Sequence, residues 1–130
     1  MKEVVFSAKA PEALGPYSQA VREGGILYLS GQIPLDPETG ALVDGDAVEQ
    51  TEWVMRHLGA ILKAAGLDWS HVVKTTIYLT DLADFGPVNA VYANFLKEPY
   101  PARATVCVAA LPKNAKVEID AIAHAPTPAP

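Results

Sequence analysis

The regular alternation of residue types along 116–124 is the feature that most limits the fold of this chain. Side chains of a β-strand point alternately to the two faces of a sheet. One face of this segment carries Val117, Ile119, Ala121 and Ala123, and the other carries Glu118, Asp120, Ile122 and His124. The alternation predicts a strand that packs one face against an apolar core.

Other segments also have the composition of strands. Segments 18–22 and 26–30 flank Glu23-Gly24-Gly25, which is a hairpin signal. Segment 72–80 is rich in β-branched residues, and an additional short strand is expected at 2–6. Segments 104–110 and 116–124 flank 111–115, which contains a proline and an asparagine. This arrangement predicts a second hairpin.

Two segments have helical periodicity. Asp46 is predicted to cap a helix whose apolar residues recur at helical spacing until Gly66 ends it. A second helix is expected to begin near Asp81 or Asp84 and to end before Pro99. The order β-β-β-α-β-α-β-β predicts an α+β fold, a mostly antiparallel sheet with two helices on one face. This single domain is expected to span 1–124, with a proline-rich tail at 125–130.

Composition disfavours several classes of function. The formal net charge is −5, and lysine and arginine form no cluster, so the basic stripe typical of nucleic-acid-binding proteins is missing. The single cysteine cannot form an internal disulfide, which favours a reducing compartment. No segment approaches the roughly 20 apolar residues that a membrane-spanning helix needs. We therefore expect a cytoplasmic protein with no nucleic-acid or membrane partner.

The sequence contains no motif that indicates a metal site or a cofactor site. His57, His71 and His124 are scattered without the spacing of metal ligands. The chain has no Gly-rich phosphate loop and no nucleophile elbow. Cys107 has no basic neighbour in the sequence and is expected to be a buried, inert thiol. We expect no metal and no cofactor.

One face of the predicted sheet is left without a cover. Two helices of ordinary length can cover one side of a five- or six-stranded sheet, and the other side carries mixed small, polar and tyrosyl groups. Two explanations stay open. The face contacts other copies of the chain in a homo-oligomer, or it is a solvated face of an antiparallel sheet.

Arg103 is the first candidate for chemistry. It follows Pro101 at the start of a strand and is predicted to share a sheet face with Thr105 and Cys107. A guanidinium held there offers a planar fork that matches a carboxylate or a phosphate. The alternative is an ordinary surface arginine paired with an acid.

An acidic residue could complete this site. Glu118 and Asp120 lie one predicted hairpin later, and a carboxylate on the same face as Arg103 could act as a general acid or base. Strand parity does not choose between the two.

Tyr17 and Gly31 lie in turn-like segments at the sheet rim, where glycine lets a ligand approach the backbone. Each residue can also be explained by the requirements of a turn alone, without a ligand.

Several spaced motifs resemble the RidA (YjgF/UK114) family. They are Gly15-Pro16-Tyr17-Ser18-Gln19-Ala20, Leu29-Ser30-Gly31-Gln32-Ile33-Pro34, Val88-Asn89-Ala90-Val91-Tyr92, Pro101-Ala102-Arg103, Leu111-Pro112-Lys113 and Val117-Glu118-Ile119-Asp120-Ala121-Ile122-Ala123. The resemblance runs from about residue 3 to residue 124, and the motifs agree in order.

The resemblance implies a fold, an assembly and an activity. The fold is chorismate-mutase-like, and the assembly is a homotrimer with clefts between subunits. The activity is hydrolysis of reactive 2-imino acids, such as 2-iminobutanoate and 2-iminopropanoate, to 2-keto acids and ammonia without a cofactor. The matching residues are a carboxylate-binding Arg103, an acid/base Glu118, and the cleft residues Tyr17, Gly31 and Asn89.

This chain departs from the family pattern at two places. Many active members have a cysteine two residues after the arginine, where this chain has Thr105, whose backbone N–H can still contact a ligand. The loop before Pro101 is also short, which would reshape one wall of a cleft. Two alternatives to the imine hydrolase are a non-catalytic protein that binds keto acids and a ribonuclease or translation inhibitor.

Overall fold

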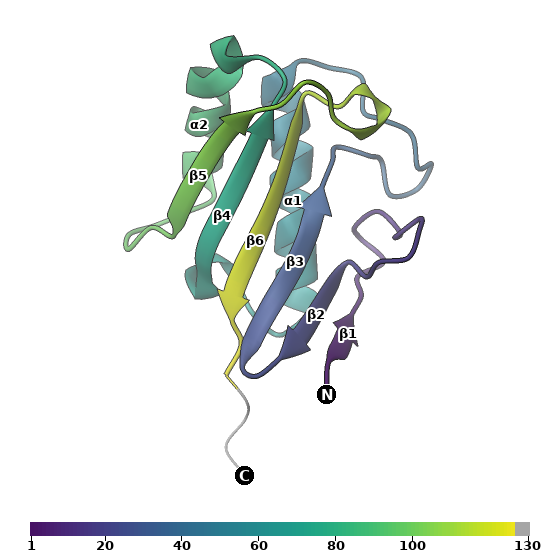
Figure 1. The fold of residues 1–130 in the computed structure, drawn as a ribbon, viewed down its shortest axis with the longest axis vertical. Helices are drawn as coiled ribbons and strands as arrows, with labels where there is room; N and C mark the ends of the chain where they lie inside the picture. The colour runs from purple at the N-terminus through teal and green to yellow at the C-terminus, as the bar shows by residue number, and fades with distance from the viewer. Residues whose placement is uncertain (127–130) are drawn as a thin grey trace.

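Six strands form one twisted sheet in the computed structural model, which describes residues 1–126 (Figure 1). The strands are β1 (Glu3–Val5), β2 (Ala20–Glu23), β3 (Ile26–Gln32), β4 (Val72–Leu79), β5 (Ala102–Cys107) and β6 (Val117–His124). The helices are α1 (Ala47–Ala64) and α2 (Phe85–Asn94), with short 3-10 turns at Trp69–His71, Leu82–Asp84 and Pro112–Asn114. Both α-helices lie on the same side of the sheet, which confirms the predicted α+β fold with one covered face.

The sheet order corrects one predicted connection. The strands lie in the order β1-β2-β3-β6-β4-β5, so β6 pairs with β3 and β4, both antiparallel. The β2–β3 hairpin is confirmed. The second predicted hairpin, between 104–110 and 116–124, is wrong, because β5 pairs with β4 in parallel and does not touch β6 in the sheet.

The crossover through α2 explains the parallel pair. A helix that follows β4 and packs on the sheet returns the chain to the end where β4 began, so β5 must run in the same direction. The chain then passes over the end of β4, where the Val108 N–H donates to the Leu79 carbonyl at 2.7 Å. It turns at Lys113 and Asn114, which both have a positive φ, and enters the sheet as β6.

The central strand β6 positions the core. Its residues Val117, Ile119, Ala121 and Ala123 are buried under the helices, as the alternation predicts. The opposite face of the sheet includes Tyr28 and Val106, which are 46% and 42% exposed. This second face is uncovered in a single chain.

Helix α1 supplies the main apolar layer on the covered face. Asp46 caps it as predicted, because its carboxylate accepts a hydrogen bond from the Glu49 N–H at 2.9 Å. Val54, Leu58 and other residues at helical spacing are fully buried, and each such side chain stabilises the fold by about 1.5–3 kcal/mol. The helix ends before Gly66, whose φ of +77° suits glycine.

One residue of β4 leaves the predicted face. Strict alternation along the strand would place Val73 on the helix side of the sheet with Thr75, Ile77 and Leu79. Val72 pairs with Ala123, whereas Lys74 pairs with Ile122, so the ladder shifts register at Val73. A bulge turns the side chain of Val73 outward, where it is 51% exposed.

The C-terminal end of the domain packs one residue past β6. Ala125 is buried, and its N–H donates to the Gly25 carbonyl at 2.8 Å. The rest of the predicted tail, 127–130, lies outside the described residues. Within the described part of the chain, no helix has both the length and the apolar character needed to cross a bilayer.

Candidate functional site

Arg103 lies on the covered face of the sheet, beside α2. The register of β4 and β5 pairs it with the buried Thr75. Its Nη1 donates to the Asn89 Oδ1 at 2.5 Å, and its Cζ lies 5.1 Å from the ring centre of Tyr92 and 5.7 Å from that of Phe85. The two rings and the amide hold the guanidinium in one place.

This arginine is available to an anion. Within residues 1–126 it forms no ion pair with a carboxylate, so it is not the paired surface arginine of the alternative interpretation. The guanidinium has five N–H donors, and the Asn89 contact uses one of them. The Tyr92 ring that supports it is fixed in turn by a 2.7 Å hydrogen bond between its hydroxyl and the Thr75 hydroxyl.

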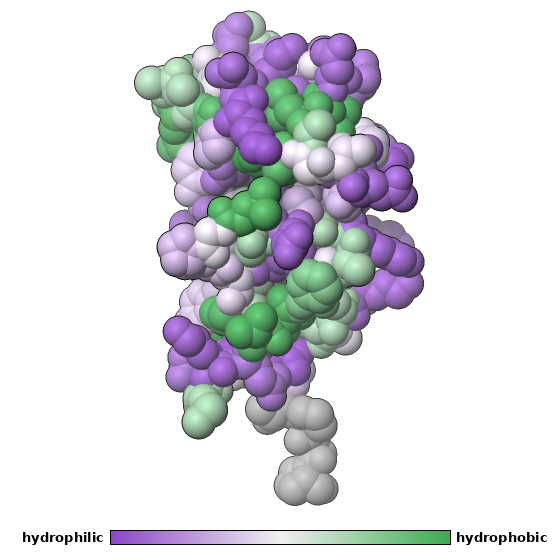
Figure 2. Space-filling model, turned by 90° about the vertical axis from the view of Figure 1, so that its right-hand side faces the viewer, coloured by the Kyte–Doolittle hydropathy of each residue, from purple (hydrophilic) through white to green (hydrophobic). Residues whose placement is uncertain are grey.

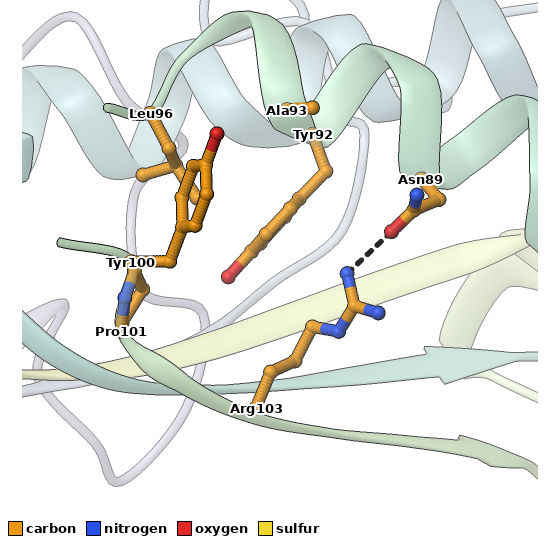
Figure 3. Close-up of a pocket in the computed structure, with 7 residues that line it drawn as sticks. All are labelled: Asn89, Tyr92, Ala93, Leu96, Tyr100, Pro101 and Arg103. Carbon is orange, nitrogen blue, oxygen red and sulfur yellow. Dashed lines mark hydrogen bonds between the residues drawn. The ribbon is translucent and has the colours of Figure 1, made fainter. Parts of the chain in front are cut away.

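A cavity of about 480 Å³ adjoins the guanidinium. Figure 3 shows Arg103 and Asn89 at one end of this cavity and Tyr100 and Leu96 toward the other, with Tyr92 between them. The cavity is lined by Asn89, Tyr92, Ala93, Leu96, Tyr100, Pro101 and Arg103. The arrangement joins one cationic end to an apolar wall.

Thr105 and Cys107 follow Arg103 along the same face of β5. The Thr105 Oγ1 is shielded from water and has no hydrogen-bond partner among the described residues. Buried hydroxyls normally have a partner, so this one has unused capacity to accept or donate a hydrogen bond. Cys107 is exposed, which corrects our expectation of a buried thiol, because β5 is an edge strand with little covering it.

Glu118 lies on the opposite, uncovered face. In the β4–β6 ladder it pairs with Tyr78, which pairs with Val106 of β5 on its other side. Arg103 belongs to the set that faces the helices, so our expectation of a shared face for Arg103 and Glu118 within one chain is wrong. The expectation assumed a β5–β6 hairpin, and the crossover through α2 changes the register.

The structure distinguishes the two acidic candidates. The Tyr78 hydroxyl donates to the Asp120 carboxylate at 2.9 Å, so Asp120 has a partner. Glu118 has no side-chain hydrogen bond within the described residues and is partly buried. Burial, and in second place the charge of Asp120, raises the pKa of Glu118 above its ordinary value. A carboxyl of this kind is suited to proton transfer.

Gly31 makes room for the Glu118 carboxyl group. The β3–β6 ladder shifts register between Leu29 and Gln32, and Gly31 lies in that irregular stretch. A Cβ at Gly31 would overlap the carboxylate of Glu118, with its Cδ at 2.9 Å and its Cγ at 3.2 Å. The glycine therefore positions the carboxyl group, a role more specific than the open backbone that we expected.

Tyr17 and Gly31 line a second cavity, of about 280 Å³, together with Leu14 and Lys113. Tyr17 is 54% exposed. Exposed apolar side chains also occur in the N-terminal segment, at Val4 and Leu14. Figure 2 shows the side of the molecule that carries β1, where hydrophobic and hydrophilic areas alternate over the surface.

The candidate residues thus form two groups. We call Asn89, Arg103 and Thr105 the arginine half-site, and Tyr17, Gly31 and Glu118 the glutamate half-site. They lie on opposite faces of the sheet, and one chain does not bring them together.

Sequence reasoning missed the aromatic support of Arg103. Phe85, Asn89 and Tyr92 are spaced at i, i+4 and i+7, which places them on one side of α2. That spacing is a usable signal, but Phe85 lies outside the sequence motifs that pointed to the site. Tyr100, in the short loop before Pro101, was also not selected. No group of three metal-ligating side chains is present among the residues that the structure describes.

Comparison with known proteins gives consistent matches. A family model described as Endoribonuclease L-PSP matches residues 7–125. Reactive Intermediate Deaminase A, chloroplastic, from Arabidopsis thaliana is 57% identical over 122 residues, which cover 94% of this chain and 65% of that protein. A 2-iminobutanoate/2-iminopropanoate deaminase from Mus musculus is 50% identical over 123 residues, which cover 95% of this chain and 91% of the mouse protein.

A solved structure agrees in fold over nearly the whole chain. TdcF from E. coli, solved with bound serine, aligns with a TM-score of 0.89 at 42% identity, covering 94% of this chain and 98% of TdcF. Other relatives of similar identity have names that state no reaction. The family-model match and these identities show that the chain belongs to the RidA family.

Proposed function

We propose that this protein hydrolyses reactive 2-imino acids to 2-keto acids and ammonia, with 2-iminobutanoate and 2-iminopropanoate among its substrates. The observation that carries the proposal is the pair of half-sites. One holds a guanidinium without an acidic partner, and the other holds a partly buried carboxyl group with a raised pKa. The names of the mouse relative and the Arabidopsis relative support the reaction class.

The proposed assembly is a homotrimer with one active site in each cleft between subunits. Three copies give three clefts, each with an arginine half-site from one copy and a glutamate half-site from its neighbour. The uncovered sheet face, with Tyr28 and Val106 exposed, supplies apolar surface that such contacts would bury.

The arginine half-site binds the substrate in this mechanism. Arg103 pairs with the carboxylate of the imino acid through two parallel hydrogen bonds, while Asn89 and the two aromatic rings keep the guanidinium in place. Thr105 adds a hydrogen bond from its backbone N–H or its hydroxyl. The contacts fix the imine carbon opposite the neighbour's glutamate half-site. The serine bound in TdcF supports a ligand of amino-acid size.

The glutamate half-site performs the proton transfers. The ionised Glu118 takes a proton from a water molecule as the water oxygen bonds to the imine carbon, which forms a carbinolamine. Glu118 then gives that proton to the nitrogen, and as the C–N bond breaks it takes the proton of the carbinolamine hydroxyl, so that the keto acid and ammonia leave. Acid/base catalysis of this kind contributes about 10²–10⁴-fold to the rate. A protonated imine is already electrophilic, so the residues of the chain need supply only position and one proton shuttle.

A coupled assay tests the proposal. A threonine dehydratase generates 2-iminobutanoate, and the release of ammonia or keto acid is timed with and without the protein. We expect Arg103→Ala to abolish the acceleration, and Arg56→Ala, which removes an exposed arginine of α1, to retain it. Undiminished acceleration by Arg103→Ala would contradict the proposal. Binding of 2-ketobutyrate without acceleration would favour a non-catalytic keto-acid-binding protein.

The description of the matching family suggests a second candidate function, that of an endoribonuclease. The net charge of −5 disfavours it, because RNA binding draws much of its affinity from cationic side chains. An RNA-binding assay at several salt concentrations separates the two functions, and we expect no salt-dependent binding.

The exposed thiol of Cys107 is also consistent with the cytoplasmic location that we propose, a reducing compartment.

A further inference from the structure

Glu118 has a second acidic side chain close to it on the uncovered face of the sheet. Glu118 and Asp120 are two residues apart on β6, so their side chains leave the same face of the strand, about 7 Å apart along it. Both residues are partly buried. Two carboxylates held this close disfavour each other's ionised form.

Tyr78 gives the two carboxyl groups different surroundings. In the β4–β6 ladder Tyr78 lies opposite Glu118, yet its hydroxyl donates to the Asp120 carboxylate at 2.9 Å. This bond holds the Asp120 carboxylate in one position and uses the hydroxyl, which is therefore not available to Glu118. Asp120 is thus the carboxylate with a fixed place, and Glu118 is the one that is free to meet a substrate.

The other titratable groups of this face leave the charge of Asp120 unpaired. Lys74 of β4 and His124 of β6 lie further along the two strands, and within residues 1–126 neither forms an ion pair with Asp120. Tyr28 is the titratable side chain that β3 contributes to this face. Strand β5 adds only alanine and valine side chains to it.

More charged groups lie where β6 begins. Three titratable residues line the second cavity beside Gly31, namely Glu12, Tyr17 and Lys113. The Lys113 Nζ donates to the Gly40 carbonyl at 3.1 Å, so this ammonium has a backbone partner. In the proposed cleft, Arg103 of a second copy also faces Glu118 and binds the substrate carboxylate. A substitution of Asp120 alone leaves all these groups in place.

We propose that Asp120 is a positioning residue for the reaction, and that its charge, fixed by the Tyr78 hydroxyl, helps to set the pH above which Glu118 is ionised and can take a proton from water. The inference rests on the proposed function, because Asp120 acts through Glu118. Burial is the largest cause that raises the pKa of Glu118, and the charge of Asp120 is the second. A carboxyl group whose pKa lies closer to neutral pH passes a proton in both directions more readily.

Asp120→Asn tests the charge with little change in shape. The amide oxygen of asparagine can still accept the Tyr78 hydrogen bond, so the position is kept while the negative charge is removed. Asp120→Glu keeps the charge at this position. Glu38→Gln is the matched control, because it removes one exposed carboxylate from the turn after β3, outside the sheet.

The first readout is the pH dependence of kcat/KM for 2-iminobutanoate, with spontaneous hydrolysis subtracted at each pH. Activity falls on the acid side as Glu118 takes up a proton, and Asp120→Asn should move the midpoint of this fall to lower pH. Two charges about 7 Å apart change an ionisation constant about threefold even in water, so we expect at least this gain in relative activity on the acid side. Asp120→Glu and Glu38→Gln should keep the original midpoint. Activity lost equally at all pH values in Asp120→Asn, or the same shift in Glu38→Gln, would overturn the role of Asp120.

A direct titration of Glu118 separates failure of this inference from failure of the proposed function. The carboxyl carbon signal of Glu118, assigned in NMR spectra with Glu118→Gln, reports its ionisation whether or not imines are hydrolysed. We expect the pKa of Glu118 to be lower in Asp120→Asn than in the unchanged protein, and to stay the same in Glu38→Gln. This shift without any imine hydrolysis would contradict the proposed function and leave the coupling of the two carboxyl groups standing. Imine hydrolysis without the shift would overturn the role of Asp120 alone.

Discussion

Replacing Gly31 by alanine should lower kcat by a large factor and the free energy of unfolding by only a small amount. The φ of Gly31 lies outside the left-handed region, so alanine can adopt the same backbone. The new Cβ would occupy the space of the Glu118 carboxylate, and this side chain must rotate away. A side chain held about 30° off its rotamer costs about 0.5–1.5 kcal/mol, and release of the buried charge to solvent offsets part of this cost, so we expect the free energy of unfolding to fall by no more than about that amount.

The effect on catalysis should be far larger. Displacement of Glu118 removes the proton shuttle, so kcat for 2-iminobutanoate should fall by about 10²–10⁴-fold. The binding of 2-ketobutyrate should change little, because Arg103 makes the carboxylate contacts in the proposed mechanism. The pKa of Glu118 should also move back toward its ordinary value once the carboxyl group reaches solvent.

The assay pairs imine-hydrolysis kinetics with urea unfolding and calorimetric binding of 2-ketobutyrate. Gly86→Ala is the matched control, since a Cβ at Gly86 meets no atom within 4 Å. We expect this control to keep its kcat. Wild-type kcat in Gly31→Ala would refute the reasoning, because it would mean that the reaction does not depend on where Gly31 places the Glu118 carboxyl group.

Three further predictions follow from individual contacts. Asn89→Ala should raise the Kd for 2-ketobutyrate about 10-fold in calorimetry, because it removes a hydrogen bond to a charged group worth about 1.5–3 kcal/mol. Tyr92→Phe should lower the free energy of unfolding by about 1–3 kcal/mol in urea, since it leaves the buried Thr75 hydroxyl unpaired. Glu118→Gln should raise Tm at pH 7, where the folded state carries the cost of the buried charge, and should lose that gain below the ordinary glutamate pKa of 4.5.

Sequence periodicity predicted the elements in which side-chain burial follows one regular pattern from end to end. The alternation over Val117–His124 and the cap at Asp46 both depend on local rules, and the structure confirms both. Val73 escaped the same rule, since a bulge depends on the neighbouring strand and leaves no mark in the sequence of β4.

Strand parity could not place the site. It sorts each strand into two faces, but it does not tell which face of one strand matches which face of the next. That match between Arg103 and Glu118 depends on whether β5 joins β6 by a hairpin or joins β4 by a crossover, and 111–115 fits either. The resemblance to the RidA family supplied both residues, and the structure supplied their separation on two faces.

The most direct test of two complementary half-sites is complementation between inactive variants. Arg103→Ala and Glu118→Gln are each expected to be inactive alone, and co-expression with two different tags gives mixed oligomers that can be purified. In a purified mixed trimer of either composition, one of the three clefts has an intact Arg103 from one subunit and an intact Glu118 from its neighbour, which is about a third of the clefts. We predict that the mixed oligomers recover imine hydrolysis to about that fraction of the wild-type rate. Mixed oligomers as inactive as the two parents would contradict a shared active site.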